Sequence, residues 1–430
     1  MRFLLVTTPV TGHVSPVLPV AGKLAERGHE LLWYTSARFQ AKIEATGARF
    51  VGFQTAQDID YHRMNELFPE RAELKGISQA KWDLKMMIDV AAEQYGDIPG
   101  ILRGFQADVI LADSCAFSAV LTAEKTGLPL ALLNVMNLFA RSRDTAPDGF
   151  GLAPNSTRLG HLRNGFLNWL VLHLVFRDVN RYFNQCRADL GLPPAGDTLF
   201  DLAIRKSRLF LQPTVPAFEY PRSDLPGHVH FIGVPPPGSA PEFVPPPWWD
   251  ELESKKPAVL VTQGTVATNP DELLGPAIQG LSGEDMLVVG TTGGKSVEDM
   301  GLKALPENVR LEPFVSFDRI MPHVDVMVTN GGYGGTHFAL AHGVPLVAAG
   351  DSEDKAEICA RIAWAGVGVN LKTKSPSPAQ IRKAVRKVLK DRSFGQRARE
   401  MQQELARYDA PAKAAELLET MGETAHQRSG

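Results

Sequence analysis

The feature that most constrains the fold is an apolar run that leads directly into a cluster of glycines. Residues 325–329 are short and apolar enough to form a buried strand of a parallel sheet, and a helical pattern covers residues 336–342. Between them lie four glycines within five residues: Gly331, Gly332, Gly334 and Gly335. Such a strand, turn and helix bring unpaired backbone N–H groups and the positive helix end to one point, which attracts an anion such as phosphate.

Two interpretations of this segment are open from its residues alone. Its spacing fits neither G-x-G-x-x-G nor G-x-x-x-x-G-K-[ST], so a tight connection without a ligand is one of them. The other is a phosphate loop, in which Thr336 caps the helix or contacts a phosphate oxygen.

The rest of the chain alternates strand and helix patterns on both sides of a proline-rich segment. Residues 233–249 contain seven prolines, which neither a helix nor a central strand accommodates. We therefore predict an α/β protein with two Rossmann-like domains facing a cleft, where ligands of parallel sheets bind. The expected boundaries are residues 1–232, a linker at 233–250, a second domain at 251–408 and a final helix at 409–430 that is expected to cross back to the first domain.

Composition narrows the class of protein. A net charge of -3 gives no reason to expect nucleic acid, and no apolar run reaches the ~20 residues of a membrane span. Three scattered cysteines without metal-ligand spacing indicate a reducing, cytoplasmic setting and no metal site. The most apolar run, residues 166–176, is expected to form a buried helix or a wall of an apolar acceptor pocket.

Two residues lie at the carboxyl ends of predicted strands, the edge of a parallel sheet where ligands bind. His13 follows the first predicted strand in the run Gly12–Pro16, and Asp113 ends the strand that begins at Val109. A histidine there suits a general base, and a carboxylate can orient it. The alternatives are a solvated histidine and an aspartate that caps the helix beginning near Cys115.

The segment from residue 330 resembles the donor-binding signature of family-1 nucleotide-sugar glycosyltransferases, continuing through Gly343-Val344-Pro345 to Asp351 and Asp354. Residues 12–16 resemble the G-H-x-x-P motif of the same family. The resemblance implies the GT-B fold, with His13 as catalytic base and Asp113 as its partner. It also implies inverting transfer of a sugar from a UDP- or TDP-sugar to a hydroxyl of a small lipophilic acceptor, such as a polyphenol, macrolide or terpenoid.

The same resemblance assigns the donor site. It implies that Phe314 and Val315 bind the base and that Thr265 contacts the diphosphate. The implied phosphate loop comprises Asn330, Gly332, Gly334, Gly335 and Thr336. The implied sugar-binding pair is Asp354 and Lys355. Three positions depart from the family pattern. Asn330 replaces a phosphate-binding histidine, Lys355 replaces a glutamine, and Phe338 stands where plant members have a ribose-binding glutamate.

No Asp-x-Asp metal motif accompanies these residues, so backbone N–H groups and a helix dipole are expected to stabilise the leaving diphosphate. The expected partners are the nucleotide sugar and the acceptor, with no cofactor or metal, in a monomer or homodimer. Two other functions fit the same fold: a nucleotide-sugar 2-epimerase, and a non-catalytic partner that binds nucleotide sugar beside another transferase.

Overall fold

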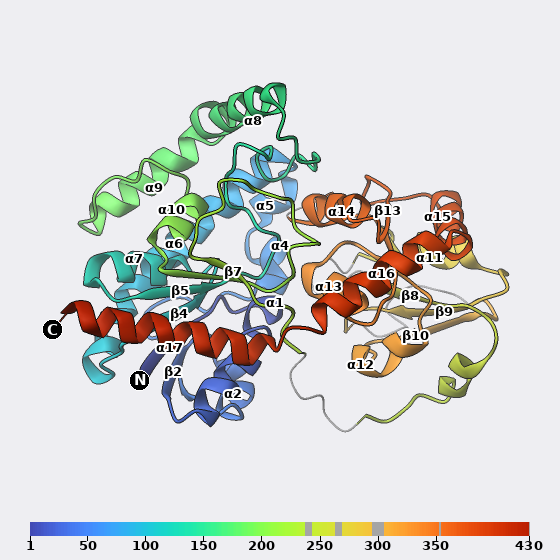
Figure 1. The fold of residues 1–430 in the computed structure, drawn as a ribbon, viewed down its shortest axis with the longest axis horizontal. Coiled ribbons are helices and arrows are strands. Elements are labelled where there is room, and N and C mark those ends of the chain that lie inside the picture. Colours follow the sequence, from blue (N-terminus) through green and yellow to red (C-terminus); the bar gives the residue numbers. More distant parts are fainter. Residues whose placement is uncertain (237–242, 263–268, 295–304, 352–353, 430) are drawn as a thin grey trace.

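The computed structural model describes residues 1–236, 243–262, 269–294, 305–351 and 354–429, with the side chains of residues 62 and 425–429 left out. Two parallel sheets lie side by side, each flanked by helices (Figure 1). The seven strands of the first sheet are, in spatial order, β3 (Arg49–Val51), β2 (Glu30–Tyr34), β1 (Arg2–Val6), β4 (Val109–Asp113), β5 (Leu130–Leu133), β6 (Leu209–Gln212) and β7 (Val229–Phe231).

The second sheet repeats this order without the seventh strand. Its strands are β10 (Val309–Glu312), β9 (Leu287–Thr291), β8 (Ala258–Thr262), β11 (Val326–Thr329), β12 (Leu346–Ala348) and β13 (Gly368–Asn370). In both sheets the third strand in space is the first in sequence, and its neighbour arrives by a long crossover. This is the doubly wound arrangement, in which ligands bind where the strand order reverses. The prediction of an α/β fold with two Rossmann-like domains is confirmed.

The helices cover both faces of each sheet. Those of the first half are α1 (Thr11–Val14), α2 (Leu18–Glu26), α3 (Gln40–Glu44), α4 (Met64–Leu67), α5 (Pro69–Glu73), α6 (Ile77–Gly104), α7 (Phe117–Thr126), α8 (Arg158–Leu170), α9 (Arg177–Asp189) and α10 (Leu199–Lys206). Those of the second half are α11 (Leu274–Leu281), α12 (Phe317–Ile320), α13 (Tyr333–Ala341), α14 (Lys355–Trp364), α15 (Pro378–Lys390), α16 (Arg392–Leu405) and α17 (Ala410–Ser429).

Near-continuous apolar strands explain why both faces are buried. In β1, Leu4 and Val6 pack on one side of the sheet, while Phe3 and Leu5 pack on the other. In β8, Ala258 and Leu260 pack in one core, while Val259 and Val261 pack in the other. Successive side chains of a strand point to opposite faces, so a run without polar residues requires helices on both.

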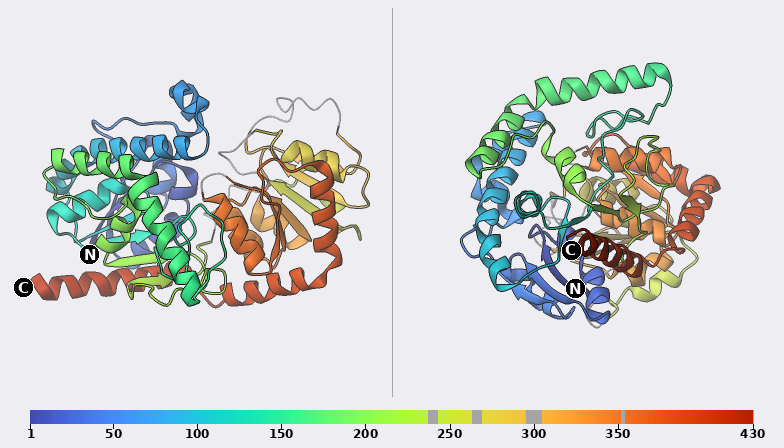
Figure 2. Two further views of the ribbon diagram at one scale, coloured as in Figure 1. Left: turned by 90° about the horizontal axis from the view of Figure 1, so that it is seen from above. Right: turned by 60° about the vertical axis from the view of Figure 1, so that its left-hand side comes forward.

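The C-terminal helix α17 crosses from the second half of the chain to the first. In Figure 2 it continues from α16 and runs alongside the first domain. It packs against α2 and β6, and its residues Ala410, Ala414, Ala415 and Leu418 share a core with one face of the first sheet. Glu419 fastens it there, because its carboxylate accepts hydrogen bonds from Arg27 at 2.7 Å and from the ring of His29 at 2.8 Å. The described end of the proline-rich segment is also packed: Trp248 is buried and donates to Glu312 at 2.8 Å.

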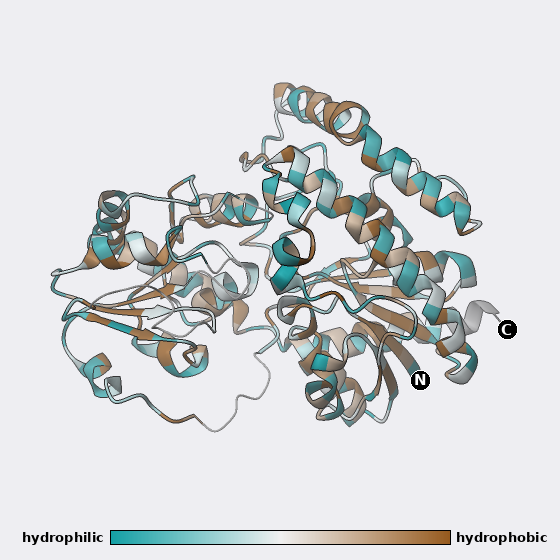
Figure 3. Cartoon of the chain, turned by 180° about the vertical axis from the view of Figure 1, so that it is seen from behind, coloured by the Kyte–Doolittle hydropathy of each residue, from teal (hydrophilic) through white to brown (hydrophobic). Residues whose placement is uncertain are grey.

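The expectation that residues 166–176 form a buried helix is wrong. They continue α8, which projects from the first domain at the top of Figure 1. Phe166, Trp169 and Leu174 are 61%, 51% and 56% exposed, and apolar residues are visible on this helix at the top of Figure 3. The domain covers this stretch only in part: three of its nine apolar residues are exposed, and the other six are half-buried. A role as a wall of an acceptor pocket stays a prediction. Across the described residues, no helix is both long and apolar enough to cross a membrane.

Candidate active site

His13 and Asp113 lie together where the order of the first sheet reverses. β1 leads into the short helix α1 that carries His13, and the neighbouring strand β4 ends at Asp113. The His13 Nδ1 and Asp113 Oδ1 atoms are 2.8 Å apart. Two residues a hundred positions apart in the chain therefore form the histidine–carboxylate pair that the sequence predicted.

The carboxylate of Asp113 is completely buried and surrounded by donors. It accepts hydrogen bonds from the Thr8 N–H at 2.6 Å, the Thr8 hydroxyl at 3.3 Å and the Cys115 N–H at 2.8 Å, in addition to the His13 ring. These donors fix the orientation of the carboxylate. Asp113 does not cap the following helix, because α7 begins only at Phe117 and its N-cap residue is Ala116.

This geometry leaves His13 ready to act through its other ring nitrogen. With Nδ1 held by Asp113, the neutral ring carries its proton on Nδ1 and presents the Nε2 lone pair. The side chain of His13 is 20% exposed, so that nitrogen is accessible to a reactant. An imidazole oriented in this way can remove a proton from a hydroxyl group, and the buried carboxylate stabilises the resulting imidazolium.

Cys115 and Tyr61 are neighbours of the pair that sequence reasoning missed. Burial, and then the negative charge of Asp113, raise the pKa of both the Cys115 thiol and the Tyr61 phenol. His13, Asp113 and Cys115 are close enough together to hold a metal ion. However, the Asp113 oxygens already accept four hydrogen bonds, and the raised pKa of Cys115 disfavours the thiolate that a metal would require. In the sequence, the only indication that Cys115 lies beside the pair is that it follows Asp113 by two residues.

The glycine-rich segment lies at the corresponding reversal point of the second sheet. β11 ends at Thr329, and α13 begins at Tyr333, three residues earlier than predicted, with Gly332 as its N-cap. No side chain caps this helix, so the N–H groups of its first turn remain available for an anion. Gly334 is exposed, and a Cβ atom placed on it would meet nothing within 4 Å. The first turn of α13 is thus open on the side where a phosphate could approach.

The expectation that Thr336 caps the helix is wrong, since Thr336 lies inside α13. Its side chain is completely buried, and its hydroxyl oxygen has no hydrogen-bond partner within the described protein. A buried hydroxyl without a partner costs ~1–3 kcal/mol. The other interpretation of Thr336, a contact between its hydroxyl and a phosphate oxygen, stays a prediction.

Asn330 and Gly331 shape the turn. Asn330 is buried, and its Oδ1 accepts a hydrogen bond from the Gly332 N–H at 3.2 Å. Gly331 has φ +85°, and a Cβ atom there would lie 2.6 Å from the sulfur of Cys359. The Asn330 side-chain oxygen therefore helps to hold the loop itself.

The predicted sugar-binding pair stands at the start of α14, beside this turn. Asp354 is the N-cap residue of α14 and is half-buried, and it makes no side-chain capping bond to its own helix. Lys355 is buried rather than solvated, because its backbone carbonyl and Cβ pack against Gly331 and Gly350. The alternative interpretation of this pair is a solvated acidic turn at the start of the helix. The burial of Lys355 does not agree with that interpretation.

The predicted base-binding residues are also placed. Phe314 follows β10 and is 65% exposed, with its ring over Gly294 at the end of β9. A Cβ atom on Gly294 would lie 2.8 Å from that ring, so only glycine allows this contact. The neighbouring Val315 is half-buried against the core. The ring of Phe314 is therefore free on its outer face to stack on a planar base. Thr265 lies outside the described residues.

The two halves of the site face each other across buried contacts between the domains. Gln212, at the end of β6, donates to the Tyr333 hydroxyl at 2.7 Å, and the Thr214 hydroxyl lies 2.7 Å from His337 Nε2. Both Tyr333 and His337 belong to α13. Burial lowers the pKa of His337 to about 4, so the ring is neutral at pH 7 and accepts from Thr214. Contacts from the end of β6 and the residues after it thereby orient the helix whose N-terminus is the candidate anion site.

A histidine–carboxylate pair and an uncapped glycine-rich helix start, facing each other between two Rossmann-like domains, define a nucleotide-sugar-dependent glycosyltransferase. Residues 282–421 match the family model of erythromycin biosynthesis protein CIII-like C-terminal domains. The chain is 44% identical over 419 residues to 4'-demethylrebeccamycin synthase of Lentzea aerocolonigenes, which covers 97% of this chain and 99% of that protein. It is 31% identical to UDP-glycosyltransferase 2 of Phaeomoniella chlamydospora, over 97% of this chain and 95% of the relative.

The fold is matched by solved structures over almost the whole chain. The glycosyltransferase of kitacinnamycin superposes with a TM-score of 0.75 at 21% identity, covering 98% of both chains. The spinosyn rhamnosyltransferase SpnG complexed with thymidine diphosphate superposes with a TM-score of 0.70 at 18% identity, covering 97% of this chain and 100% of that one. The chain belongs to the family-1 glycosyltransferases of the GT-B fold, as its sequence motifs predicted. These comparisons support neither an epimerase nor a non-catalytic partner.

Proposed function

We propose that this glycosyltransferase transfers a sugar from a UDP- or TDP-sugar to a hydroxyl group of a small lipophilic natural product, with inversion at the anomeric carbon. The observation that carries the proposal is the pairing of His13 with the buried carboxylate of Asp113, opposite the uncapped first turn of α13. Relatives named as a rebeccamycin-type synthase and a demethyllactenocin mycarosyltransferase support an acceptor of this class. The three free thiols agree with a reducing cytoplasm.

The residues divide the reaction between the two domains. His13 Nε2 takes the proton of the acceptor hydroxyl while its oxygen forms a bond to the anomeric carbon. At the same time the bond from that carbon to the diphosphate oxygen breaks, and the nucleoside diphosphate leaves with the electron pair. Asp113 stabilises the imidazolium, and the N–H groups at the start of α13 stabilise the diphosphate charge, with the Thr336 hydroxyl as a further donor.

The donor contacts are a further part of the proposal. We place the base against Phe314 and the Val315 backbone, the phosphates at Asn330, Gly332, Gly334, Gly335 and Thr336 with Thr265, and the sugar hydroxyls at Asp354 and Lys355. The test is incubation of the purified protein with a panel of UDP- and TDP-sugars and with a polyphenol, a macrolide and a terpenoid, read by mass spectrometry. A product heavier than its acceptor by one sugar supports the proposal. Conversion of donor alone into an isomeric nucleotide sugar would instead identify an epimerase.

We expect transfer to survive removal of metal ions. The positive charge that diphosphate departure requires is supplied in this proposal by the N-terminus of α13, which is open and uncapped. Activity in EDTA should therefore equal activity in its absence, measured as initial rates with one donor and acceptor. Loss of turnover in EDTA that Mg²⁺ or Mn²⁺ restores would show that a metal carries this charge.

Removing the carboxylate of Asp354 should slow transfer from every donor. A carboxylate there can accept two sugar hydroxyl groups, and its loss should cost ~1–3 kcal/mol in the transition state. Lys355 can only donate, so Lys355→Gln should change the ranking of donors rather than abolish activity. The measurement is kcat/KM for each donor with Asp354→Ala and Lys355→Gln. Unchanged rates and an unchanged donor ranking would remove both residues from the sugar site.

A further inference from the structure

A glutamate of the donor-side helix α14 holds a loop of the acceptor-side domain. Glu357 Oε1 accepts hydrogen bonds from the backbone N–H groups of Gly149 at 2.9 Å and Gly151 at 2.6 Å. Both glycines have positive φ, and a Cβ atom on Gly151 would lie 3.5 Å from the Ala356 carbonyl oxygen of α14. The loop thus approaches the helix closely, in a backbone conformation that side chains disfavour.

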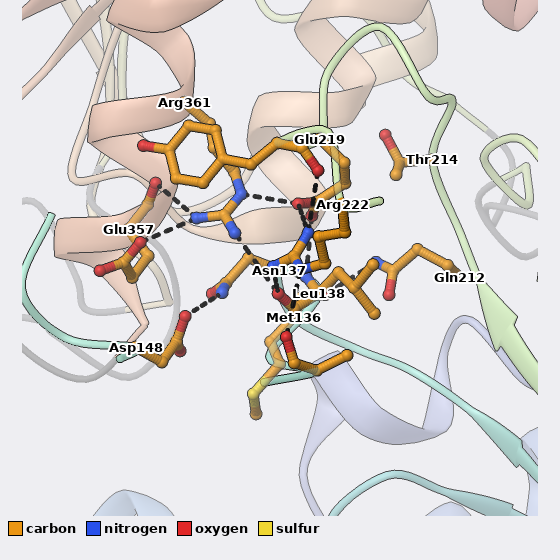
Figure 4. Close-up of polar contacts among 12 residues, drawn as sticks. Met136, Asn137, Leu138, Asp148, Gln212, Thr214, Glu219, Arg222, Glu357 and Arg361 are labelled. Carbon is orange, nitrogen blue, oxygen red and sulfur yellow. Dashed lines mark hydrogen bonds and ion pairs between the residues drawn. The ribbon is translucent and has the colours of Figure 1, made fainter. Parts of the chain in front are cut away.

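Arg361 links this contact to a second attachment of the same loop. Its guanidinium donates to Glu357 Oε2 at 2.9 Å and to Glu219 Oε2 at 2.8 Å, while Glu219 Oε1 accepts from the Leu138 N–H at 2.8 Å (Figure 4). Arg222 donates to the Leu138 carbonyl oxygen. Arg361 and Glu219 are each 1% exposed. Charged hydrogen bonds in such a dry setting are strong and leave little freedom to the segment they hold.

The loop that is held in this way begins beside the catalytic pair. It follows β5, which is the neighbour of β4 and of Asp113 in the sheet. Its first residue, Asn134, accepts a hydrogen bond from the hydroxyl of Ser114, the residue after Asp113, at 2.7 Å. Residues 134–151, here called the β5 loop, therefore run from the catalytic pair to the helix that starts at the sugar-binding candidate Asp354.

We propose that Glu357 is a positioning residue that sets the β5 loop as part of the acceptor site and ties its position to the donor-side helix. Glu357 lies in the first turn of α14, three residues after Asp354, so any shift of that helix moves the loop. The proposal rests on the proposed function, because it assigns the loop to acceptor recognition. It predicts that loss of the Glu357 carboxylate loosens acceptor binding and leaves nucleotide binding at α13 intact.

The test compares Glu357→Ala and Glu357→Gln with Glu124→Ala. Glu124 is a matched control, because it also pairs with a buried arginine, Arg187, at 2.9 and 3.0 Å, but at the end of α7 remote from Asp113. The first measurement is hydrogen–deuterium exchange of peptides covering the β5 loop, which needs no enzymatic activity. The second is nucleoside diphosphate affinity by calorimetry. The third is the KM for acceptor and for donor, with the fraction of donor hydrolysed without transfer.

Glu357→Ala should increase exchange across residues 138–151 and raise the acceptor KM by ~10-fold or more, with donor KM and nucleotide affinity within ~2-fold of the parent. Glu357→Gln keeps an oxygen that can accept from Gly149 and Gly151, so it should restore much of the loop protection. Unchanged loop exchange in Glu357→Ala would overturn the proposal. Equal losses for acceptor and donor, as general destabilisation by Glu124→Ala would cause, would also overturn it. If the parent protein glycosylates no acceptor, the proposed function fails, while the exchange and nucleotide data still decide whether Glu357 holds the loop.

Discussion

His13→Ala should reduce sugar transfer by ~10²–10⁴-fold, because general-base catalysis contributes that much to proton-transfer reactions. The ring of His13 is the accessible member of its pair, with Nδ1 held at 2.8 Å from Asp113 and Nε2 directed away from that bond. Nucleotide binding should persist, since the phosphate loop belongs to the other domain. The measurements are initial rates under saturating donor and nucleoside diphosphate affinity by calorimetry.

His29→Ala is the matched control for this variant. His29 also pairs with a carboxylate at 2.8 Å, that of Glu419, but the pair fastens α17 outside the catalytic edge of the sheet. It should leave turnover within a few-fold of the parent. Near-normal turnover of His13→Ala would remove His13 from catalysis, and a parallel loss of nucleotide affinity would indicate a structural role instead.

Arg361→Ala should lower the free energy of unfolding by ~3–5 kcal/mol, the usual effect of breaking a buried ion pair by removing one partner. The guanidinium pairs with two buried carboxylates, Glu219 and Glu357. Its loss would leave Glu219 with the more distant Arg222, at 3.7 Å, and Glu357 with the backbone N–H groups of the β5 loop. It also stacks on the ring of Tyr220, with its central carbon 4.2 Å from the ring centroid. Urea unfolding followed by fluorescence should show the transition midpoint displaced to much lower denaturant.

The control for this stability effect is Arg397→Ala. Arg397 forms an exposed pair with Glu400 on α16 at 2.9 Å, and exposed pairs contribute only ~0–1 kcal/mol. If Arg361→Ala were as mild as Arg397→Ala, the buried network would contribute nothing to stability. In that event its role would be confined to orienting the β5 loop.

The two carboxylates around Arg361 also explain why the domains meet at a defined orientation. Glu219 comes from the first domain and Glu357 from the second, and one arginine bonds both. A little further along the interface, Gln212 holds the Tyr333 hydroxyl. Buried polar contacts of this kind are satisfied in one geometry only, so displacement of one domain would leave charged groups unpaired.

The sequence by itself determined the fold class and the meeting of His13 with Asp113. Short apolar runs such as 325–329 favour buried strands, and strands that alternate with helices form parallel sheets whose carboxyl ends collect the functional residues. His13 and Asp113 follow two such strands, so their meeting follows from topology. The glycine cluster predicted an uncapped turn between a strand and a helix for the same reason, although α13 begins earlier than its periodicity suggested.

Only the tertiary structure decided how the two domains are joined. Glu357 and Gly149 are 208 residues apart, and Arg361 and Glu219 are 142 apart. Neither pair has a local signal, because a charged residue on a helix looks solvated until another domain covers it. The exposure of α8 was missed for the converse reason: an apolar helix pattern reports a preference for burial, but not whether the fold supplies a surface to bury it. Periodicity describes one element at a time, and contacts between distant elements exist only once the chain is packed.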